Sequence, residues 1–212
     1  MRFSAIIKKV LEKDRRLKIV ILGPDNAGKT SLLRAYLNQN IADIKPTYGY
    51  QIVKTEMEVE KNKYEIEILD IGGQKSIRAY WDTYYSGVDG VLFVYDTYGT
   101  DEYKKIIENT VSHPTLQDTE FICASNKADD ITQEETRQIK YIQITQHNPE
   151  IPRTDPGFDF MANTENISEN QQNTVNKEIE IMYTSAKNKI NVERVFRRLI
   201  ENILKKQRNA VL

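Results

Sequence analysis

Residues 23–30 match the phosphate-binding pattern G-x-x-x-x-G-K-[ST], with the sequence Gly-Pro-Asp-Asn-Ala-Gly-Lys-Thr. An apolar run at 17–22 precedes the pattern and a helical stretch begins near Lys29, which is the strand–turn–helix context the pattern requires. Two glycines let the backbone wrap around phosphates and direct N–H groups at them, and the helix start adds its positive dipole end. Lys29 supplies a cation and Thr30 a hydroxyl for Mg²⁺. The alternative is a glycine turn with a chance lysine. The expected phosphate-binding residues are Asp25, Asn26, Ala27, Gly28, Lys29, Thr30 and Ser31.

Apolar runs alternate with helical stretches along the rest of the chain. Strands are expected at 17–22, 49–60, 64–70, 90–95, 120–125 and 179–184, and helices at 101–112, 132–146 and 192–203. This alternation predicts an α/β fold, doubly wound, with a mostly parallel sheet and helices on both faces.

One segment, residues 145–178, breaks the alternation. It holds three of the six prolines and nine Asn or Gln residues, with six acidic residues against two basic ones. It is expected to be a low-complexity insertion, either a partner-binding arm or tolerated chain, and we favour the second. The predicted domains are an amphipathic helix at 1–16, a main domain at 17–206 interrupted by this insertion, and a tail at 207–212.

Composition excludes several classes of protein. The chain has 30 basic and 31 acidic residues, which argues against a sequence-independent nucleic-acid binder. Its single cysteine, Cys123, excludes an intrachain disulfide framework and a cysteine zinc site. No run approaches the roughly 18 apolar residues of a membrane span, and no signal-peptide core is present. A cytoplasmic protein is therefore expected. Arg2 and the absence of a C-terminal cysteine exclude myristoylation and prenylation signals, so any membrane attachment would come from another source.

A carboxylate closes the predicted strand 64–70, forty residues after Thr30. At a strand end beside a phosphate loop, Asp70 can hold Mg²⁺, here through water. Gly73 can present its N–H to a γ-phosphate, and Gln74 can orient an attacking water because it has both a donor and an acceptor. Thr47, in the polar stretch before the second strand, can add an oxygen to Mg²⁺, although by itself it is more simply a loop threonine. The expected metal ligands are Thr30, Thr47 and Asp70, and the expected catalytic residues are Lys29, Gly73 and Gln74.

Asn126-Lys127-Ala128-Asp129 follows a further apolar strand. A carboxylate at Asp129 can accept from the ring N–H and the amino group of guanine, and adenine offers neither donor there. Taken alone, the four residues also fit a cluster that caps a helix before Thr132. Ser185, Ala186 and Lys187, after the last strand, would close over the base. The sequence therefore predicts a guanine-nucleotide site that includes Asn126, Lys127 and Asp129.

These segments, in this order, resemble those of a small GTPase, and most closely the ADP-ribosylation-factor-like branch. The similarity is carried by the loop 23–30, Pro46-Thr47-x-Gly49, Asp-Ile-Gly-Gly-Gln at 70–74, Ile77-Arg78-x-x-Trp81 and Tyr84-Tyr85. It covers roughly 1–144 and 179–206. Within the branch, the chain is most similar to members that release lipidated cargo from carrier proteins.

The resemblance implies a P-loop NTPase fold with a six-stranded sheet, GTP or GDP and Mg²⁺ as ligands, and a monomer that acts as a GDP/GTP switch. Exchange factors, activating proteins and effectors would bind through 41–51 and 70–86. An N-terminal helix would be released with GTP and could contact membrane. The expected setting is vesicle or ciliary trafficking, in the cytoplasm or at a peripheral membrane.

The chain also departs from the family pattern. Pro24 replaces the usual leucine and Arg2 a glycine that many members lipidate. Of three positions that often grip effectors, Tyr50 and Tyr84 are aromatic, but Leu69 replaces the usual tryptophan.

Two other functions remain open. The first is a protein that binds guanine nucleotide without cycling, because a proline at position 24 would stiffen the loop. A P-loop kinase is the other, although its lid would need arginines and the insertion has only Arg153. For a switch, the sequence offers no evident cis arginine finger, so hydrolysis is expected to be slow without an activating protein.

Overall fold

A computed structural model describes residues 15–147 and 174–210, which form an α/β domain around one mixed sheet. The sheet has seven strands in the order β2-β3-β1-β4-β5-β7-β6. Its five central strands are parallel: β1 (Arg16–Leu22), β3 (Asn62–Ile71), β4 (Gly90–Asp96), β5 (Glu120–Asn126) and β7 (Thr174–Tyr183). The edge strands β2 (Tyr50–Val59) and β6 (Ile139–His147) are each antiparallel to their neighbour.

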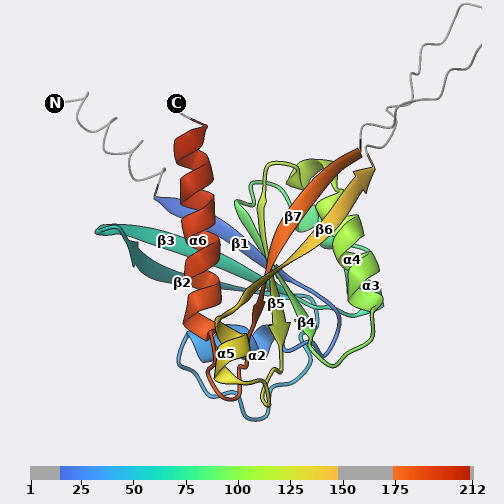
Figure 1. Cartoon of the computed structure of the whole chain (residues 1–212), viewed down its shortest axis with the longest axis vertical. Helices are drawn as coiled ribbons and strands as arrows, with labels where there is room; N and C mark the ends of the chain where they lie inside the picture. The colour runs from blue at the N-terminus through green and yellow to red at the C-terminus, as the bar shows by residue number, and fades with distance from the viewer. Residues whose placement is uncertain (1–14, 148–173, 211–212) are drawn as a thin grey trace, which may run out of the picture.

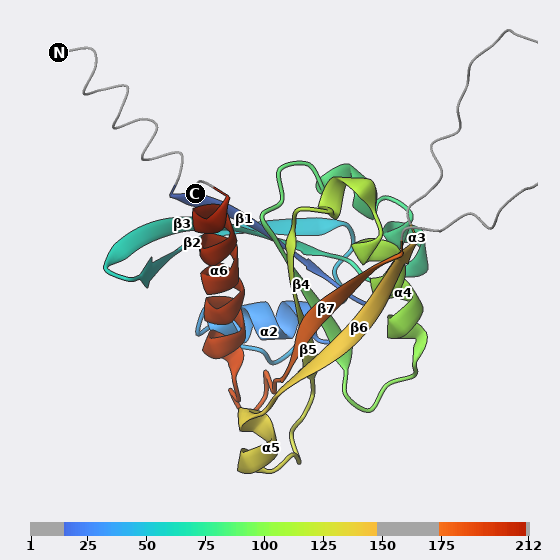
Figure 2. The same cartoon turned by 45° about the horizontal axis from the view of Figure 1, so that its top comes forward.

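Helices cover both faces of the sheet (Figures 1 and 2). On one face lie α2 (Lys29–Tyr36) and α6 (Val192–Asn209), and Phe196 of α6 stacks on Tyr36 of α2 with ring centroids 4.2 Å apart. On the other lie α4 (Glu102–Val111) and the 3-10 helices η1 (Trp81–Tyr84) and η2 (Pro114–Leu116). The short helices α3 (Lys75–Arg78) and α5 (Gln133–Arg137) complete the set. The expected fold class is confirmed.

The apolar stripe of the last helix is confirmed residue by residue. Its members are all buried, namely Val192, Val195, Phe196, Leu199, Ile200 and Ile203. The helix runs to Asn209, past the expected domain end at 206. Among the described residues, no helix combines the length and the apolar character that crossing a bilayer would require.

The predicted helix at 132–146 is wrong over most of its length. Thr132 and Glu135 form a reciprocal capping box that starts α5, but the backbone is extended at Gln138 and continues as β6. Ile144 is buried with Ile107 and Val111 of α4, and Ile142, two residues earlier, packs against the same cluster, which is the period of a strand. The sheet therefore has seven strands instead of the six expected.

The strands β6 and β7 also change the limits of the predicted insertion. β6 continues to His147 and β7 begins at Thr174, so both ends of the segment 145–178 belong to an antiparallel ribbon. The last of the predicted strands, 179–184, accordingly starts earlier, at Thr174. In Figure 1 the ribbon points away from the end of the sheet that carries α2 and α5. Residues 148–173 and most of the predicted N-terminal helix 1–16 lie outside the described residues.

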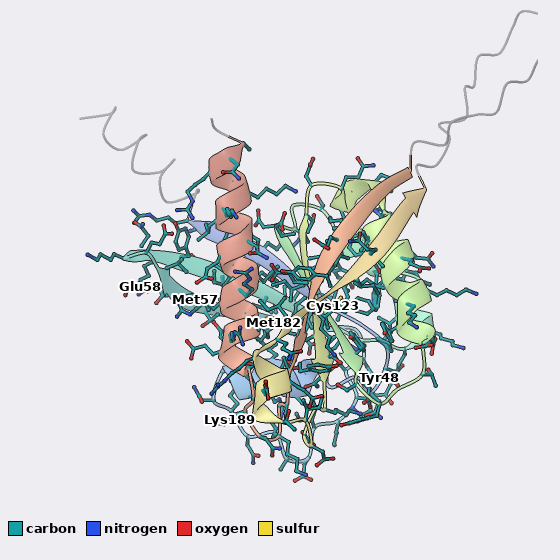
Figure 3. The ribbon with its side chains drawn as sticks, in the orientation of Figure 1. Tyr48, Met57, Glu58, Cys123, Met182 and Lys189 are labelled. Carbon is teal, nitrogen blue, oxygen red and sulfur yellow. The ribbon has the colours of Figure 1, made fainter. Side chains whose placement is uncertain are left out.

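Sulfur-bearing side chains mark the two cores (Figure 3). Met57 and Met182 belong to the cluster under α2 and α6, and Cys123 belongs to the cluster under α4. Complete burial raises the pKa of the Cys123 thiol, so this cysteine is a core residue.

Candidate nucleotide-binding site

The predicted phosphate loop connects β1 to α2 at the carboxyl edge of the sheet. α2 begins at Lys29, so the backbone N–H groups of its first turn have no partner within the helix. Gly23 has φ +143°, and a Cβ there would overlap the carbonyl oxygen of Val94 on β4. This position therefore accepts only glycine, and the loop is pressed against the end of the sheet.

Lys29 lies beneath the loop. Its side-chain nitrogen Nζ donates to the carbonyl oxygens of Gly23 and Pro24 at 3.0 and 2.8 Å, and the residue is only 6% exposed. Burial lowers the pKa of this amine to about 8, against the opposing influence of Asp70 and Asp25. Because its carbonyl is one of the acceptors, Pro24 is accommodated in the loop without loss of this contact.

A cavity of about 240 Å³ opens over the loop. Gly73 closes part of its wall, where a Cβ would lie 2.5 Å from Nζ of Lys29 and overlap the Gly23 carbonyl oxygen. The tertiary fold therefore joins three separate predicted segments around one space. Its lining comprises Asp25, Asn26, Gly28, Lys29, Thr30, Ser31, residues 44–47, Gly72 and Gly73.

Two predicted residues lie elsewhere. Ala27 does not line the cavity; it is buried, and its carbonyl accepts from the Asn126 amide. Gln74, directly after Gly73, occupies the N-cap position of α3 in an extended conformation, makes no side-chain capping hydrogen bond and is partly exposed.

The three predicted metal ligands lie together beside this cavity. Thr30 Oγ1 lies 2.6 Å from Asp70 Oδ2, to which it donates, and 2.8 Å from Thr47 Oγ1. Asp70 is 0% exposed, and burial raises the pKa of its carboxyl while hydrogen bonds from Thr30 and Gln51 oppose this shift. Within the described part of the chain, Asp70 Oδ1 has no hydrogen-bond partner. Three hard oxygen donors with one unsatisfied buried carboxylate oxygen fit Mg²⁺.

The predicted base-binding residues also meet. Asn126 is buried: its Nδ2 donates to the Ala27 carbonyl at 3.0 Å, and its Oδ1 accepts from Thr184 Oγ1 at 3.2 Å. Its side chain thus connects the loop 126–129 to the phosphate loop through a hydrogen bond. Lys127, with φ +62°, donates to Asp96 at 2.8 Å.

Asp129 faces the second base loop. Its Oδ1 accepts from the Ser185 hydroxyl, and the Asn188 N–H donates to that same hydroxyl oxygen at 2.9 Å. Ala186 is buried and Lys187 exposed. The predicted loops 126–129 and 185–187 therefore form one hydrogen-bonded unit at the end of β5 and β7.

Sequence reasoning missed three residues of the site, Gln51, Thr184 and Asn188. Gln51 could have been noticed, because alternate residues of β2 face inward. Gln51 is the side-chain amide among these inward positions, and the next inward residue is Val53. Thr184 and Asn188 carry no such signal, since polar residues after a strand are common in turns.

The predicted partner segments border the cavity. Tyr50 on β2 and Tyr84 lie with ring centroids 5.0 Å apart, while Leu69 is buried opposite Ile52. Tyr48, on the periphery in Figure 3, is 79% exposed, and Tyr50 and Ile52 are each 50% exposed. The segments 41–51 and 70–86 therefore contain both cavity residues and exposed apolar side chains.

Comparison with known proteins identifies similar chains. Residues 3–203 match the ADP-ribosylation factor family. Identity is 35% over 154 residues with ADP-ribosylation factor-like protein 2 of Dictyostelium discoideum, covering 70% of this chain and 80% of that one. It is 42% over 97 residues with the Drosophila melanogaster protein of that name, covering 46% and 50%, and 33% over 132 residues with that of Arabidopsis thaliana, covering 61% and 69%.

Proposed function

The chain belongs to the ADP-ribosylation factor family of small GTPases, and we propose that it is a GTP-binding switch that hydrolyses GTP to GDP in the cavity over the phosphate loop. The observation that carries this proposal is the meeting of three separate segments at one edge of the sheet. The phosphate loop supplies the Lys29 cation and Thr30, the segment 70–73 supplies Asp70 for the metal site and Gly73 for a γ-phosphate contact, and the loop 126–129 supplies a base pocket.

The chain's own residues have distinct tasks in this proposal. Lys29 and the N–H groups at the start of α2 bind the phosphates and offset the charge that develops on them. Thr30, Thr47 and Asp70 would hold Mg²⁺, which would neutralise phosphate charge. Gln74 orients a water whose oxygen bonds to the γ-phosphorus while the bond to the β–γ bridging oxygen breaks. The products are GDP and phosphate, which takes up the water proton.

The output of the switch is partner binding. Thr47 and Gly73 lie in the segments that border the cavity, so loss of the γ-phosphate would release both. The exposed side chains of Tyr48 and Tyr50 would then change position together with the segment 41–51. Effectors, exchange factors and activating proteins are accordingly proposed to bind 41–51 and 70–86.

The cellular role proposed is the trafficking of membranes or lipidated cargo, in the cytoplasm or at a peripheral membrane. Its support is the resemblance of the chain to cargo-releasing members of the family, carried in part by Asp-Ile-Gly-Gly-Gln at 70–74.

A protein that binds guanine nucleotide without cycling is the competing function. Against it, Thr47 already lies 2.8 Å from Thr30, and Pro24 leaves the Lys29 contacts intact. The kinase function is weakened by the hydrogen-bonded base pocket around Asp129.

The identity of the bound nucleotide tests the proposal first. The protein is purified with Mg²⁺ and denatured, and the released nucleotide is identified by ion-exchange chromatography beside Lys29→Ala. Stoichiometric GDP or GTP that is lost in the variant is expected. Adenine nucleotide, or failure of the purified chain to bind added GTP or GDP, would overturn the proposed function.

A second experiment measures hydrolysis. In a single-turnover assay of loaded GTP, Gln74→Leu is expected to keep GTP bound for longer than the wild type. Equal rates in the two proteins would remove Gln74 from the mechanism, and no turnover in either, with GTP bound, would favour the non-cycling function.

A further inference from the structure

Gln51 makes a contact that none of the functions above requires. The register of the β2–β3 hairpin places it directly opposite Asp70, and its Nε2 donates to Asp70 Oδ2 at 2.8 Å. The other inward positions of β2 carry no amide: they are Val53, Thr55, Met57 and Val59. The amide thus occupies the inward position of β2 that meets the carboxylate.

Asp70 depends on few donors. Its Oδ2 accepts from Thr30 Oγ1 and from Gln51, while Oδ1 has no partner among the described residues. Thr30 itself is a proposed metal ligand. Of the two donors to this carboxylate, Gln51 is therefore the one that is not itself a proposed metal ligand. A carboxylate held on one oxygen by two donors cannot rotate freely, and its second oxygen stays available.

We propose that Gln51 is the positioning residue of the divalent-cation site: its amide holds the Asp70 carboxylate in the orientation that serves Mg²⁺ bound with guanine nucleotide. This inference rests on the proposed function, because it needs the metal site at Thr30, Thr47 and Asp70. It adds a residue that acts through Asp70 and not by contact with the metal, as partners of metal-binding carboxylates commonly do.

The position of Gln51 also joins the cation site to the exposed surface. Its neighbour Tyr50 points to the opposite face of β2 and contacts Tyr84. At the end of the same strand, the Gly72 N–H donates to the Gly49 carbonyl at 2.8 Å. A displacement of β2 by a partner would therefore move the donor of Asp70 as well.

The test is the Mg²⁺ dependence of nucleotide release. Dissociation of fluorescently labelled GDP is followed while free Mg²⁺ is raised from a chelated baseline, for the wild type and Gln51→Met, which keeps the side-chain length without the donor. The Mg²⁺ concentration that half-maximally slows release is expected to rise about tenfold in the variant. Release in chelator is expected to be unchanged.

A matched control exists at the other edge of the sheet. Gln143 stands opposite Glu178 in the β6–β7 ribbon, and its Nε2 donates to Glu178 Oε1 at 2.9 Å. Gln143→Met removes the same kind of cross-strand bond far from the nucleotide, and its Mg²⁺ dependence should equal that of the wild type.

A double-mutant cycle separates positioning from a general structural role. If Gln51 acts through Asp70, then Gln51→Met should add nothing to the Mg²⁺ dependence of an Asp70→Asn protein. Additive effects, a wild-type Mg²⁺ curve for Gln51→Met, or faster release of that variant in chelator alone would each overturn this inference and leave the GTPase proposal standing. If GDP release from the wild type does not depend on the Mg²⁺ concentration, the assignment of the metal site is wrong, and the inference about Gln51 is wrong with it.

Discussion

At the residue scale, the site depends on two kinds of side chain: those that would contact a ligand, and those that connect one loop to another by hydrogen bonds. Asn126 ties the phosphate loop to the base loop, and Ser185 stands between Asp129 and the Asn188 N–H. Because Asn126 and Ser185 are buried, loss of a hydrogen-bond partner leaves a buried polar group unsatisfied. In the proposed function, specificity for the base would depend on the hydrogen bonds that hold Asp129 in place.

Asp129→Asn tests that specificity. The amide loses the acceptor for the amino group of guanine and gains a donor for the 2-oxo group of xanthine. We expect at least about tenfold weaker binding of GTP and tighter binding of xanthosine triphosphate, measured by competition against labelled nucleotide. The exposed neighbour variant Asp130→Asn should retain the preference of the wild type. If both variants discriminate alike, Asp129 does not select the base.

At the element scale, the segment from Gly72 to Tyr85 connects the cavity to the cluster under α4. Trp81 of η1, the single tryptophan of the chain, is buried and donates its Nε1–H to the Gly72 carbonyl at 3.0 Å. Any movement of Gly72 or Gly73 therefore changes the surroundings of the indole.

Tryptophan emission should accordingly report the nucleotide state. We expect a different emission intensity or maximum when GDP is replaced by a non-hydrolysable GTP analogue, and no such change in Trp81→Phe. Identical spectra of the wild type with both nucleotides would show that the segment stays in place.

An ion pair between Arg198 and Glu180 connects the last helix, α6, to the last strand, β7. Arg198 of α6 donates from two nitrogens to the two carboxylate oxygens of Glu180 on β7, at 2.8 and 2.7 Å. Arg197, one residue earlier, makes only a single-nitrogen contact with Glu193 at 3.4 Å and another with the Glu58 carbonyl at 3.2 Å. Bidentate pairs are the stronger ones.

Arg198→Met is therefore expected to lower the free energy of unfolding by about 1 kcal/mol, a value reduced by the partial exposure of the pair. Arg197→Met should change it by less than about 0.5 kcal/mol. Urea unfolding followed by circular dichroism measures both, and equal losses would contradict the special role of the bidentate geometry.

At the scale of the whole molecule, the nucleotide site and the β6–β7 ribbon tip lie at opposite ends of the sheet (Figure 1). Lys177 lies near the start of β7, at the tip end of the ribbon. Its amine lies 4.4 Å from the Phe121 ring centroid and donates to the Thr119 carbonyl at 3.0 Å. Burial lowers the pKa of this amine to about 8, helped by Lys206 and opposed by Glu120 and Asp118.

This shift predicts a pH dependence of global stability. Between pH 8 and the ordinary value of 10.5, the unfolded chain keeps the proton that the native amine has released, so this group makes unfolding less favourable as pH rises. Below pH 8 its burial cost is fully present. In urea unfolding, the free energy of unfolding of Lys177→Met should rise less with pH over this range than that of the wild type. The free energy of unfolding of the exposed-lysine control Lys205→Met should follow that of the wild type. Parallel curves for Lys177→Met and the wild type would contradict the shift.

Much of the site could be predicted because each segment needs particular residue types at a strand end. A phosphate loop requires glycines and Lys29, and a metal site beside it requires an acid such as Asp70, so local chemistry alone identified them. Parallel strands carry these ends to one edge. The stripe of α6 was equally readable, since its apolar spacing from Val192 to Ile203 fits a helix.

Tertiary structure decided what local sequence left ambiguous. Residues 139–147 carry isoleucines at spacings compatible with a helix or a strand, and only pairing with β7 and burial of Ile144 against α4 select the strand. The contact of Gln51 with Asp70 likewise exists only through the register of β2 on β3. The sequence by itself determined the chemistry of each loop, because that chemistry depends on residue type. The long-range pairings were decided by the folded chain, because their free energy comes from partners distant in sequence.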